Sequence, residues 1–350
     1  MTEKMQMDIR TFSKEDLKLF FEENNEKGFR GQQVYEWLWK KGVRSFEEMT
    51  NLSKDVRKLL SEKFVINALQ VEKFELSKDG TKKFVFRLFD GNIIEGVLIP
   101  GKERTTACIS SQVGCNLGCR FCATSNLKFR RNLNFDEIFD QISILNAESL
   151  EIFKMPLSNI VFMGMGEPLL NYDNVMKAIS IITSDHSFGF SPKRITVSTV
   201  GIPKMIRKLG DDKSKINLAV SLHCANDKKR SRIIPFNSNS SLNTVKEAIE
   251  YYYDKTSNRV TFEYILLKDF NDSITDAREL AEFCKFVPCK VNVIEYNSVT
   301  PSPYQKSSRE NTDAFTSFLE SRNMIITVRR SKGQDINAAC GQLAGKITKS

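Results

Sequence analysis

From residue 105 onward, short runs rich in β-branched residues alternate with amphipathic segments of helical period. The strand candidates are TTACISS (105–111), NIVFMGM (159–165), RITVSTV (194–200), INLAVSLH (216–223), RVTFEYILL (259–267), VNVIEYN (291–297) and MIITVRR (324–330). Such alternation is typical of a parallel sheet covered by helices. Six repeats and a closing strand favour an α/β fold of partial (β/α)6 barrel type over a flat doubly wound sheet.

The chain before the barrel has a different pattern. Segments 13–25, 30–42 and 45–64 have the spacing of helices, and serines stand where N-caps belong. Residues 82–100 form two β-rich runs that meet at Asp90-Gly91, a dipeptide suited to a primed hairpin turn. We therefore predict a helical accessory domain over 1–75, a β-hairpin linker over 76–104 that carries Glu95, and a core domain over 105–350. Trp37 and Trp39 are expected to pack the small domain.

Composition limits the functions to consider. The net charge of +9 favours a polyanionic partner such as RNA. The chain shows no apolar run of membrane-spanning length and no secretory signal, so we expect a cytoplasmic protein without membrane contact. In a reducing compartment its eight cysteines are expected to be metal ligands or catalytic thiols. Only two histidines occur, which makes a multi-histidine metal site impossible.

Three cysteines crowd into the segment GCNLGCRFC, at Cys115, Cys119 and Cys122. Three thiolates on one tight loop suit a cubane iron–sulfur cluster whose fourth iron has no protein ligand. Such clusters usually have four cysteine ligands, so an open iron marks a place for chemistry. The alternative is a zinc site with Cys108 as the fourth sulfur, although zinc loops usually come as paired C-x2-C knuckles.

Polar and small residues follow the predicted strands. In parallel β/α folds, ligands lie at the carboxyl ends of the strands. Hydroxyls, an amide, a carboxylate and glycine backbone around a cluster would suit a zwitterionic ligand. The residues at these strand ends are Gly166, Glu167, Ser198, Ser221, Leu222, His223 and Asn297, with Cys340 after the last strand.

Several motifs together resemble one known family. The loop CNLGCRFC is similar to the cluster motif of radical S-adenosylmethionine enzymes. The segments CISSQVGC, FMGMGEPLLNYDN, TVSTVG, VSLH, FEYILL and DINAACGQLAG together resemble the dual-specificity RNA adenine-C2 methyltransferases within that superfamily. The resemblance covers essentially the whole chain and implies that the helical domain, helix–hairpin–helix-like in the family, is an accessory RNA-binding domain.

The resemblance also implies a role for each matching residue. Cys115, Cys119 and Cys122 would bind one 4Fe–4S cluster. Cys340 would carry the methyl group, Cys108 would resolve the intermediate and Glu95 would act as a base. The residues implied to contact S-adenosylmethionine are Gly166, Glu167, Ser198, Ser221, Leu222, His223 and Asn297.

The implied reaction is methylation of adenine C2 by a radical mechanism. Its substrates would be one adenine of 23S rRNA in the peptidyl transferase centre and the adenine 3′ of the anticodon in certain tRNAs. It would use two S-adenosylmethionine molecules per turnover and an electron donor of flavodoxin or ferredoxin type. A thiol reductant would reopen a transient Cys108–Cys340 disulfide. A monomer is expected.

Two other functions remain open from the sequence. One is methylation of adenine C8 of rRNA, as in the sister family that confers antibiotic resistance and shares the cysteine set. The other is a zinc-stabilised RNA-binding protein without catalysis. The segments EGVLIP with Glu95 and GEPLLN with Pro168 favour the C2 family.

Overall fold

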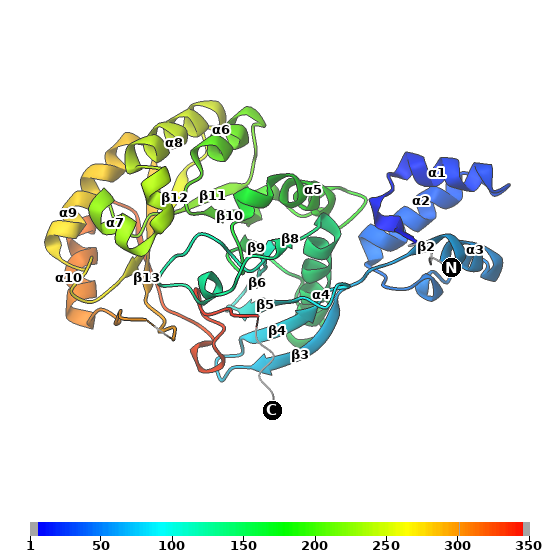
Figure 1. Cartoon of the computed structure of the whole chain (residues 1–350), viewed down its shortest axis with the longest axis horizontal. Coiled ribbons are helices and arrows are strands. Elements are labelled where there is room, and N and C mark those ends of the chain that lie inside the picture. The colour runs from blue at the N-terminus through cyan, green and yellow to red at the C-terminus, as the bar shows by residue number, and fades with distance from the viewer. Residues whose placement is uncertain (1–5, 301, 346–350) are drawn as a thin grey trace.

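The computed structural model describes residues 6–300 and 302–345 (Figure 1). The ends of the first and last predicted domains, 1–5 and 346–350, and residue 301 lie outside the described residues. The main sheet has the strand order β14-β13-β12-β11-β10-β9-β6-β5-β4-β3. Neighbours among β6 and β9–β14 pair in parallel, which confirms all seven predicted strands and the partly open barrel. Their bounds are β6 (Thr105–Cys108), β9 (Asn159–Phe162), β10 (Ile195–Thr199), β11 (Asn217–Ser221), β12 (Val260–Leu266), β13 (Cys289–Glu295) and β14 (Ile326–Arg329).

Helices lie on the outside of the curved sheet, as Figure 1 shows. Strand β12 explains why, because every one of its residues is buried and successive side chains point to opposite faces. Phe262 and Tyr264 pack on aromatic rings of the outer helices, whereas Glu263 and Ile265 line an inner cavity. The helices are α4 (Phe135–Phe153), α5 (Tyr172–Thr183), α6 (Pro203–Asp211), α7 (Asp227–Ile233), α8 (Leu242–Thr256), α9 (Ile274–Phe283) and α10 (Arg309–Glu320).

The predicted hairpin is longer and better connected than a linker. Strands β4 (Lys82–Arg87) and β5 (Ile93–Pro100) pair as expected, and β5 continues the barrel sheet by pairing antiparallel with β6. A further strand, β3 (Gln70–Leu76), begins inside the segment that the sequence assigned to the helical domain. The primed turn is wrong, because Gly91 (φ 78°) has positive φ but Asp90 does not, and a primed type I turn needs both.

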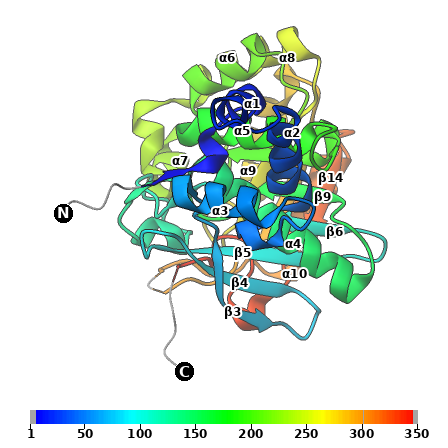
Figure 2. The same cartoon turned by 90° about the vertical axis from the view of Figure 1, so that its right-hand side faces the viewer.

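The N-terminal domain contains α1 (Lys14–Glu23), α2 (Phe29–Glu36) and α3 (Lys54–Lys63). Ser13 caps α1 in a capping box. A strand pair, β1 (Met7–Asp8) with β2 (Phe64–Val65), was not predicted, and only the second half of segment 45–64 is α-helical. These helices lie at one side of the barrel in Figure 1 and in front of it in Figure 2.

Trp39 joins this domain to the barrel instead of packing only within it. Its ring lies 5.8 Å from that of Phe135 and 5.0 Å from that of Phe139, both on α4. An ion-pair cluster reinforces the same junction, since the buried Arg10 contacts Asp136 and Asp140 of α4. The domain is therefore fixed against α4 by apolar and charged contacts together.

A second short pair shapes the loop that follows β6. Strand β7 (Gln112–Val113) pairs antiparallel with β8 (Arg131–Asn132), so the chain between them forms a closed loop above the barrel. In residues 6–300 and 302–345 no helix has the length and hydropathy to span a bilayer.

Candidate active site

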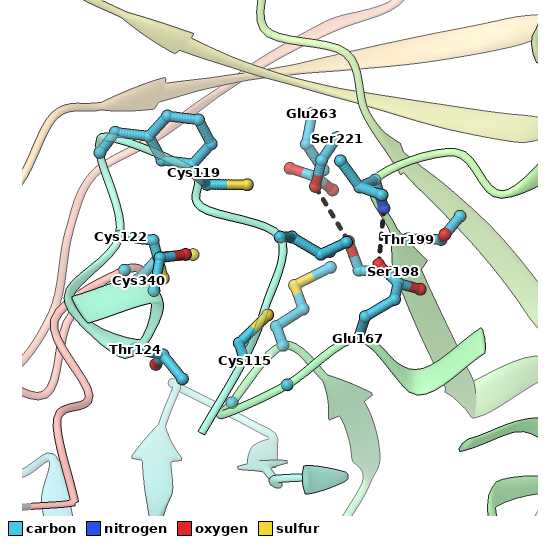
Figure 3. Close-up of a pocket in the computed structure, with 18 of the residues that line it drawn as sticks. Cys115, Cys119, Cys122, Thr124, Glu167, Ser198, Thr199, Ser221, Glu263 and Cys340 are labelled. Atoms are coloured by element: carbon cyan, nitrogen blue, oxygen red, sulfur yellow. Dashed lines mark hydrogen bonds between the residues drawn. The ribbon is translucent and has the colours of Figure 1, made fainter. Parts of the chain in front are cut away.

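Cys115, Cys119 and Cys122 lie on the loop closed by β7 and β8. All three line one cavity of about 140 Å³ (Figure 3). Gly114 (φ 75°) turns the chain into this loop, and a Cβ atom there would lie 2.4 Å from the carbonyl oxygen of Lys128, so only glycine fits. The sequence prediction that these thiols share one site agrees with the structure.

Burial dominates the electrostatics of these thiols. It raises the pKa of Cys115 to about 11 and that of Cys119 well above its ordinary value. The charges of the neighbouring cysteines act in the same direction. The protein alone therefore keeps Cys115 and Cys119 as thiols, and a metal that binds them as thiolates would displace protons and offset their mutual repulsion.

The opposite wall of this cavity is formed by the predicted strand-end residues. Figure 3 shows Glu167, Ser198 and Ser221 facing the cysteine loop across the cavity. Gly166 and His223 line the same cavity. Gly166 (φ 98°) needs to be glycine, because a Cβ atom there would lie 2.5 Å from the Cβ of Gln112. Five of the seven predicted cofactor contacts thus line the cavity that holds the cysteines.

The Glu167 carboxylate has backbone partners of its own. Its two oxygens accept hydrogen bonds from the amides of Val200 (2.8 Å) and Leu169 (3.0 Å). Burial nevertheless raises its pKa to about 7. The Thr199 side chain is a third hydrogen-bond partner. A carboxylate offers about four acceptor sites, so the group still suits an ammonium ion in the cavity.

His223 is a buried neutral imidazole. Burial, and then the charge of Arg230, lowers its pKa to about 3. Its Nδ1 accepts a hydrogen bond from the Ile265 amide at 3.1 Å. Its ring lies 4.6 Å from that of Phe121 in the cysteine loop, so His223 supports this loop and does not exchange protons at neutral pH.

Two predicted contacts do not line this cavity. Leu222 is fully buried, and its amide donates to the Glu263 carbonyl. Asn297 lies behind the C-terminal loop, where its Nδ2 donates to the Cys340 carbonyl at 3.3 Å and its Oδ1 accepts from Gln334. In this structure Asn297 positions the Cys340 loop.

A second cavity, of about 590 Å³, adjoins the first. Cys108, at the end of β6, lines it, and Cys340 lines both cavities. Burial, and then the charge of Cys340, raises the pKa of Cys108 to about 12. Cys340 is exposed at the mouth of the two cavities, yet the protein atoms around its thiol, followed by the charges of Glu263 and Cys122, raise its pKa to about 12. The barrel therefore brings two thiols from distant parts of the sequence to one place. Basic residues around this cavity are Arg104, Lys290, Arg329, Arg330 and Lys332.

Hydrogen bonds hold the Cys340 loop at both ends. The Gly333 amide donates to Asp79, and the Ser77 hydroxyl donates to Asp335, which ties the loop to the hairpin. On the other side, the Ala123 amide donates to the Gly341 carbonyl at 2.7 Å. The loop with Cys340 is thus attached directly to the loop with the three cysteines.

Glu95 lies next to the C-terminal segment and lines neither cavity. Its residue is only 3% exposed, and its Oε2 accepts from the Ala344 amide at 2.9 Å. Burial raises its pKa, while Lys83 and the amides of Ala344 and Gly345 oppose this shift. This carboxylate therefore does not face solvent, although it lies in a strand of the hairpin.

The sequence prediction missed Glu263. This carboxylate lines both cavities, and its Oε1 accepts from Asn292 Nδ2 at 2.7 Å. Burial raises its pKa, opposed by the charge of Arg329 and the hydrogen bond from Asn292. The available signal was a carboxylate inside a long β-rich run, because such a group is rarely buried without a purpose.

The zinc alternative requires Cys108 beside the three cysteines. Cys108 instead lines the second cavity with Cys340 and is absent from the lining of the first. Among the described residues, no three His, Cys, Asp or Glu side chains lie close enough together to bind a single metal ion. The alternative ligand set is therefore not assembled in this structure.

Comparison with known proteins now gives the class. Residues 109–284 match the family model of the radical SAM superfamily. A crystal structure described as a radical SAM methyltransferase from Sphaerobacter thermophilus superposes with a TM-score of 0.92, at 36% identity over 97% of this chain and 100% of that chain. This chain therefore has the fold and the cysteine loop of a radical SAM protein.

The N-terminal domain and two full-length relatives identify the family. Residues 7–66 match the family model "Ribosomal RNA large subunit methyltransferase N-terminal domain". A protein of Christiangramia forsetii described as "Probable dual-specificity RNA methyltransferase RlmN" is 56% identical over 97% of this chain and 96% of its own length. The "Dual-specificity RNA methyltransferase RlmN" of Geotalea uraniireducens is 40% identical over 98% of each. The chain belongs to the RlmN family.

Membership of the radical SAM superfamily implies a 4Fe–4S cluster and S-adenosylmethionine. The residues present fit this pair. Three thiols, one buried and two half-buried, form one wall of the first cavity, and a carboxylate, two hydroxyls and glycine backbone form the other. Thiolates are the usual protein ligands of such clusters, and the polar wall suits the amino-acid end of S-adenosylmethionine.

Proposed function

We propose that this chain methylates adenine C2 in 23S rRNA and tRNA through a methyl group carried on Cys340. One observation carries the proposal. Cys340 lines both the cavity that holds the three cysteines and the cavity that holds Cys108. A thiol that receives a group in one cavity and delivers it in the next needs this position. The full-length relatives named as dual-specificity RNA methyltransferases support the substrate class.

In this proposal Cys115, Cys119 and Cys122 hold the cluster. The polar wall holds S-adenosylmethionine. Glu167 accepts from its ammonium group, and Ser198 and Ser221 donate to its carboxylate or ribose oxygens. When bound, cluster and cofactor together supply the methyl group and the radical chemistry, with two cofactor molecules consumed per turnover. The enclosing walls keep water from these reactive species. The proposed cofactor residues are Gly166, Glu167, Ser198, Ser221, Leu222, His223 and Asn297.

The protein's own thiols then complete the transfer. Cys340 loses its proton as its sulfur gains the methyl carbon. The bound cofactor would supply the radical that takes one hydrogen atom from this methyl group, and the remaining carbon bonds to adenine C2. The adduct then gives up one electron, which the cluster would accept, and the C2 proton. Cys108 as thiolate attacks the Cys340 sulfur, which forms a Cys108–Cys340 disulfide and breaks the carbon–sulfur bond, and the released carbon takes up a proton to complete the methyl group on C2. An external thiol reductant restores both thiols by exchange. In the proposal Glu95 takes up the proton lost from adenine C2.

RNA recognition is part of the same proposal. Residues 1–75 would bind RNA as an accessory domain, and the target adenine would have to leave its stack to reach the second cavity. Arg329, Arg330 and Lys332 stand around that cavity, where they suit phosphate contacts. A second basic group, over 228–232, is a weaker candidate, since Arg230 is fully buried and Lys229 pairs with Asp276.

Arg131 is also a weak candidate for RNA binding. It follows the cysteine loop together with Lys128 and Arg130, but it pairs with Glu137 and Asp90. For the remaining partners we propose an electron donor of flavodoxin or ferredoxin type and a monomeric, cytoplasmic enzyme. The identity of the electron donor, the oligomeric state and the location do not change the proposed steps at Cys340.

Mass spectrometry of nucleosides tests this proposal. Anaerobically reconstituted protein is incubated with 23S rRNA and tRNA fragments, a reductant and S-adenosylmethionine labelled in its methyl group. We expect labelled 2-methyladenosine from both RNAs. Labelled 8-methyladenosine would transfer the chain to the sister activity, and unlabelled RNA with a fully loaded cluster would refute methyl transfer to RNA.

A further inference from the structure

Arg230 is a buried cation with only neutral hydrogen-bond partners. It lies on α7 and exposes none of its surface. In the described part of the chain its donors reach the carbonyls of Leu222 (3.1 Å), Val200 (2.6 Å) and Ser221 (3.2 Å) and the side-chain oxygen of Asn237. Carbonyl and amide oxygens satisfy the N–H groups but leave the positive charge uncompensated.

Arg10 gives the contrast within the same chain. Arg10 is also buried, at 3% exposure, but Asp8, Asp136 and Asp140 surround its guanidinium. The charges of Asp140, Asp136 and Asp8 raise the pKa of Arg10 against the effect of burial. For Arg230 burial prevails, and its pKa is lowered to about 10. Burying a charge without a carboxylate partner costs free energy. We therefore expect Arg230 to have a negative partner that the protein chain itself does not supply.

That partner belongs on the side of the cysteine loop. After burial, Cys119 is the strongest electrostatic influence on Arg230, ahead of Cys224 and the solvent-exposed Asp227. Arg230 in turn lowers the pKa of Cys119. The loop rests on the end of α7, because the amide of Arg120, next to Cys119, donates to the Ile233 carbonyl at 2.9 Å. The uncompensated cation therefore lies within electrostatic reach of Cys119, one of the three proposed cluster ligands.

We propose that Arg230 is the fixed countercharge of the iron–sulfur cluster and raises its reduction potential. This inference rests on the proposed assignment of Cys115, Cys119 and Cys122 as cluster ligands. A cubane cluster with three thiolates carries net negative charge, and reduction adds one electron to it. A nearby positive charge in a medium of low dielectric constant stabilises that added electron. Arg230 keeps its protons throughout, so the step involves only an electron from a one-electron donor such as dithionite.

The same guanidinium also fixes the cofactor wall. Its bonds to the carbonyls of Val200 and Ser221 hold together the ends of β10 and β11, which carry Ser198 and Ser221. Two substitutions separate the positioning role of Arg230 from the effect of its charge on the cluster. The Arg230→Lys substitution keeps the charge and loses the fork of hydrogen bonds, whereas Arg230→Gln loses both.

A redox titration followed by electron paramagnetic resonance tests the proposal. Wild-type protein, Arg230→Gln and Arg230→Lys are loaded with cluster anaerobically, and iron, sulfide and circular dichroism are compared. We expect at least a tenfold lower ratio of reduced to oxidised cluster for Arg230→Gln at a given potential, equal to about 59 mV for one electron. Arg230→Lys is expected to keep the wild-type potential. Arg232→Gln is the matched control, since this exposed residue lies on the same helix, over the ring of Phe270.

If Arg230→Gln does not take up a cluster, a second variant tests the effect of Arg230 on the reduction potential. Asn237→Asp leaves Arg230 in place but puts a carboxylate against its guanidinium, so it too is expected to lower the potential. An unchanged potential in either loaded variant overturns the proposal. If the wild-type protein binds no cluster, the proposed function fails instead, and the two failures are therefore distinct.

Discussion

The two adjoining cavities differ in where their thiols come from. In the first, all three cysteines belong to one short loop, and hydroxyls and a carboxylate at strand ends form the opposite wall. In the second, Cys108 comes from the first strand of the barrel and Cys340 from the loop after the last strand, and basic residues surround them. The first cavity suits a cluster and a zwitterion, and the second suits a polyanionic substrate.

The first set of cysteines is brought together by sequence proximity, and the second only by the fold. The spacing of Cys115, Cys119 and Cys122 fixes their proximity in any compact loop. Cys108 and Cys340 meet only because the barrel closes and because Asn297 and the Ala123–Gly341 hydrogen bond hold the last loop in place. Variants of the first cavity should therefore remove the cofactor, whereas variants of the second should spare the cofactor and stop the transfer.

The largest expected effect comes from Cys119→Ala in the first cavity. Loss of one of three thiolates removes a cluster ligand, so we expect iron and sulfide per chain to collapse and methylation to fall by at least about 1,000-fold. Iron analysis and incorporation of labelled methyl into RNA measure both. Cys284→Ala is the control, because Cys284 is buried and lines neither of the two cavities. Full cluster content in Cys119→Ala would contradict the assignment.

Cys340→Ser separates the two cavities most directly. Serine is a far weaker nucleophile and cannot form the disulfide, so methylation is expected to fall as far as in Cys119→Ala. Iron and sulfide content should stay at the wild-type level, because Cys340 is not one of the three cluster ligands. Persistent methylation by this variant would remove Cys340 from the mechanism, and loss of iron would make it a ligand.

The barrel could be predicted from the sequence because its signals are local. Strands β6 and β9–β14 each combine β-rich composition with flanking breakers, and the helices between them have a clear period. Strand β3 was missed because four of its seven residues are charged or polar and it lies at the edge of the sheet, where alternation is weak. The turn at Asp90-Gly91 was misassigned because the dipeptide fits a primed turn as well as a three-residue loop with one left-handed glycine.

The site could also be predicted only where its signals are local. Strand-end position identified Glu167, Ser198 and Ser221, since parallel strands end at one edge. A carboxylate inside a β-rich run is the one local signal for Glu263, but its position between the two cavities depends on the curvature of β12 and β13. The burial of Arg230 was equally hidden, because in the sequence it stands among Lys228, Lys229 and Arg232, which read as one basic face.

Cys108→Ala is expected to trap the reaction in the second cavity. The carbon bridge between Cys340 and adenine would form once and then persist, because no neighbouring thiol attacks the Cys340 sulfur. Denaturing gels should show RNA attached to protein in an amount close to the cluster-loaded enzyme. Cys289→Ala, a partly buried cysteine outside both cavities, should release free methylated RNA. Free product at the wild-type rate from Cys108→Ala would refute its role.

Glu95→Gln is expected to have a smaller effect, a loss of about 10²- to 10⁴-fold in turnover, which is typical for removal of a general base. Burial raises the pKa of Glu95, so its carboxylate form disappears as pH falls through a value above the ordinary 4.5. Wild-type turnover should drop on the acid side of that pKa, and the glutamine variant should lack this drop. Measurement of turnover against pH with cluster content held constant checks this, and identical profiles would assign Glu95 a structural role at Ala344.

The smallest effect is expected from Arg330→Gln at the rim of the second cavity. This exposed guanidinium has no ion-pair partner in the described residues, so its removal should weaken RNA binding only a few-fold and leave cluster content unchanged. Without its phosphate partner, the slope of log affinity against log salt concentration should become shallower by about 1. Arg309→Gln, an exposed charge on α10 that pairs with Asp313, is the matched control with an unchanged slope. An equal slope in both variants would remove Arg330 from the RNA-binding surface and leave the larger effects at Cys340 and Cys119 untouched.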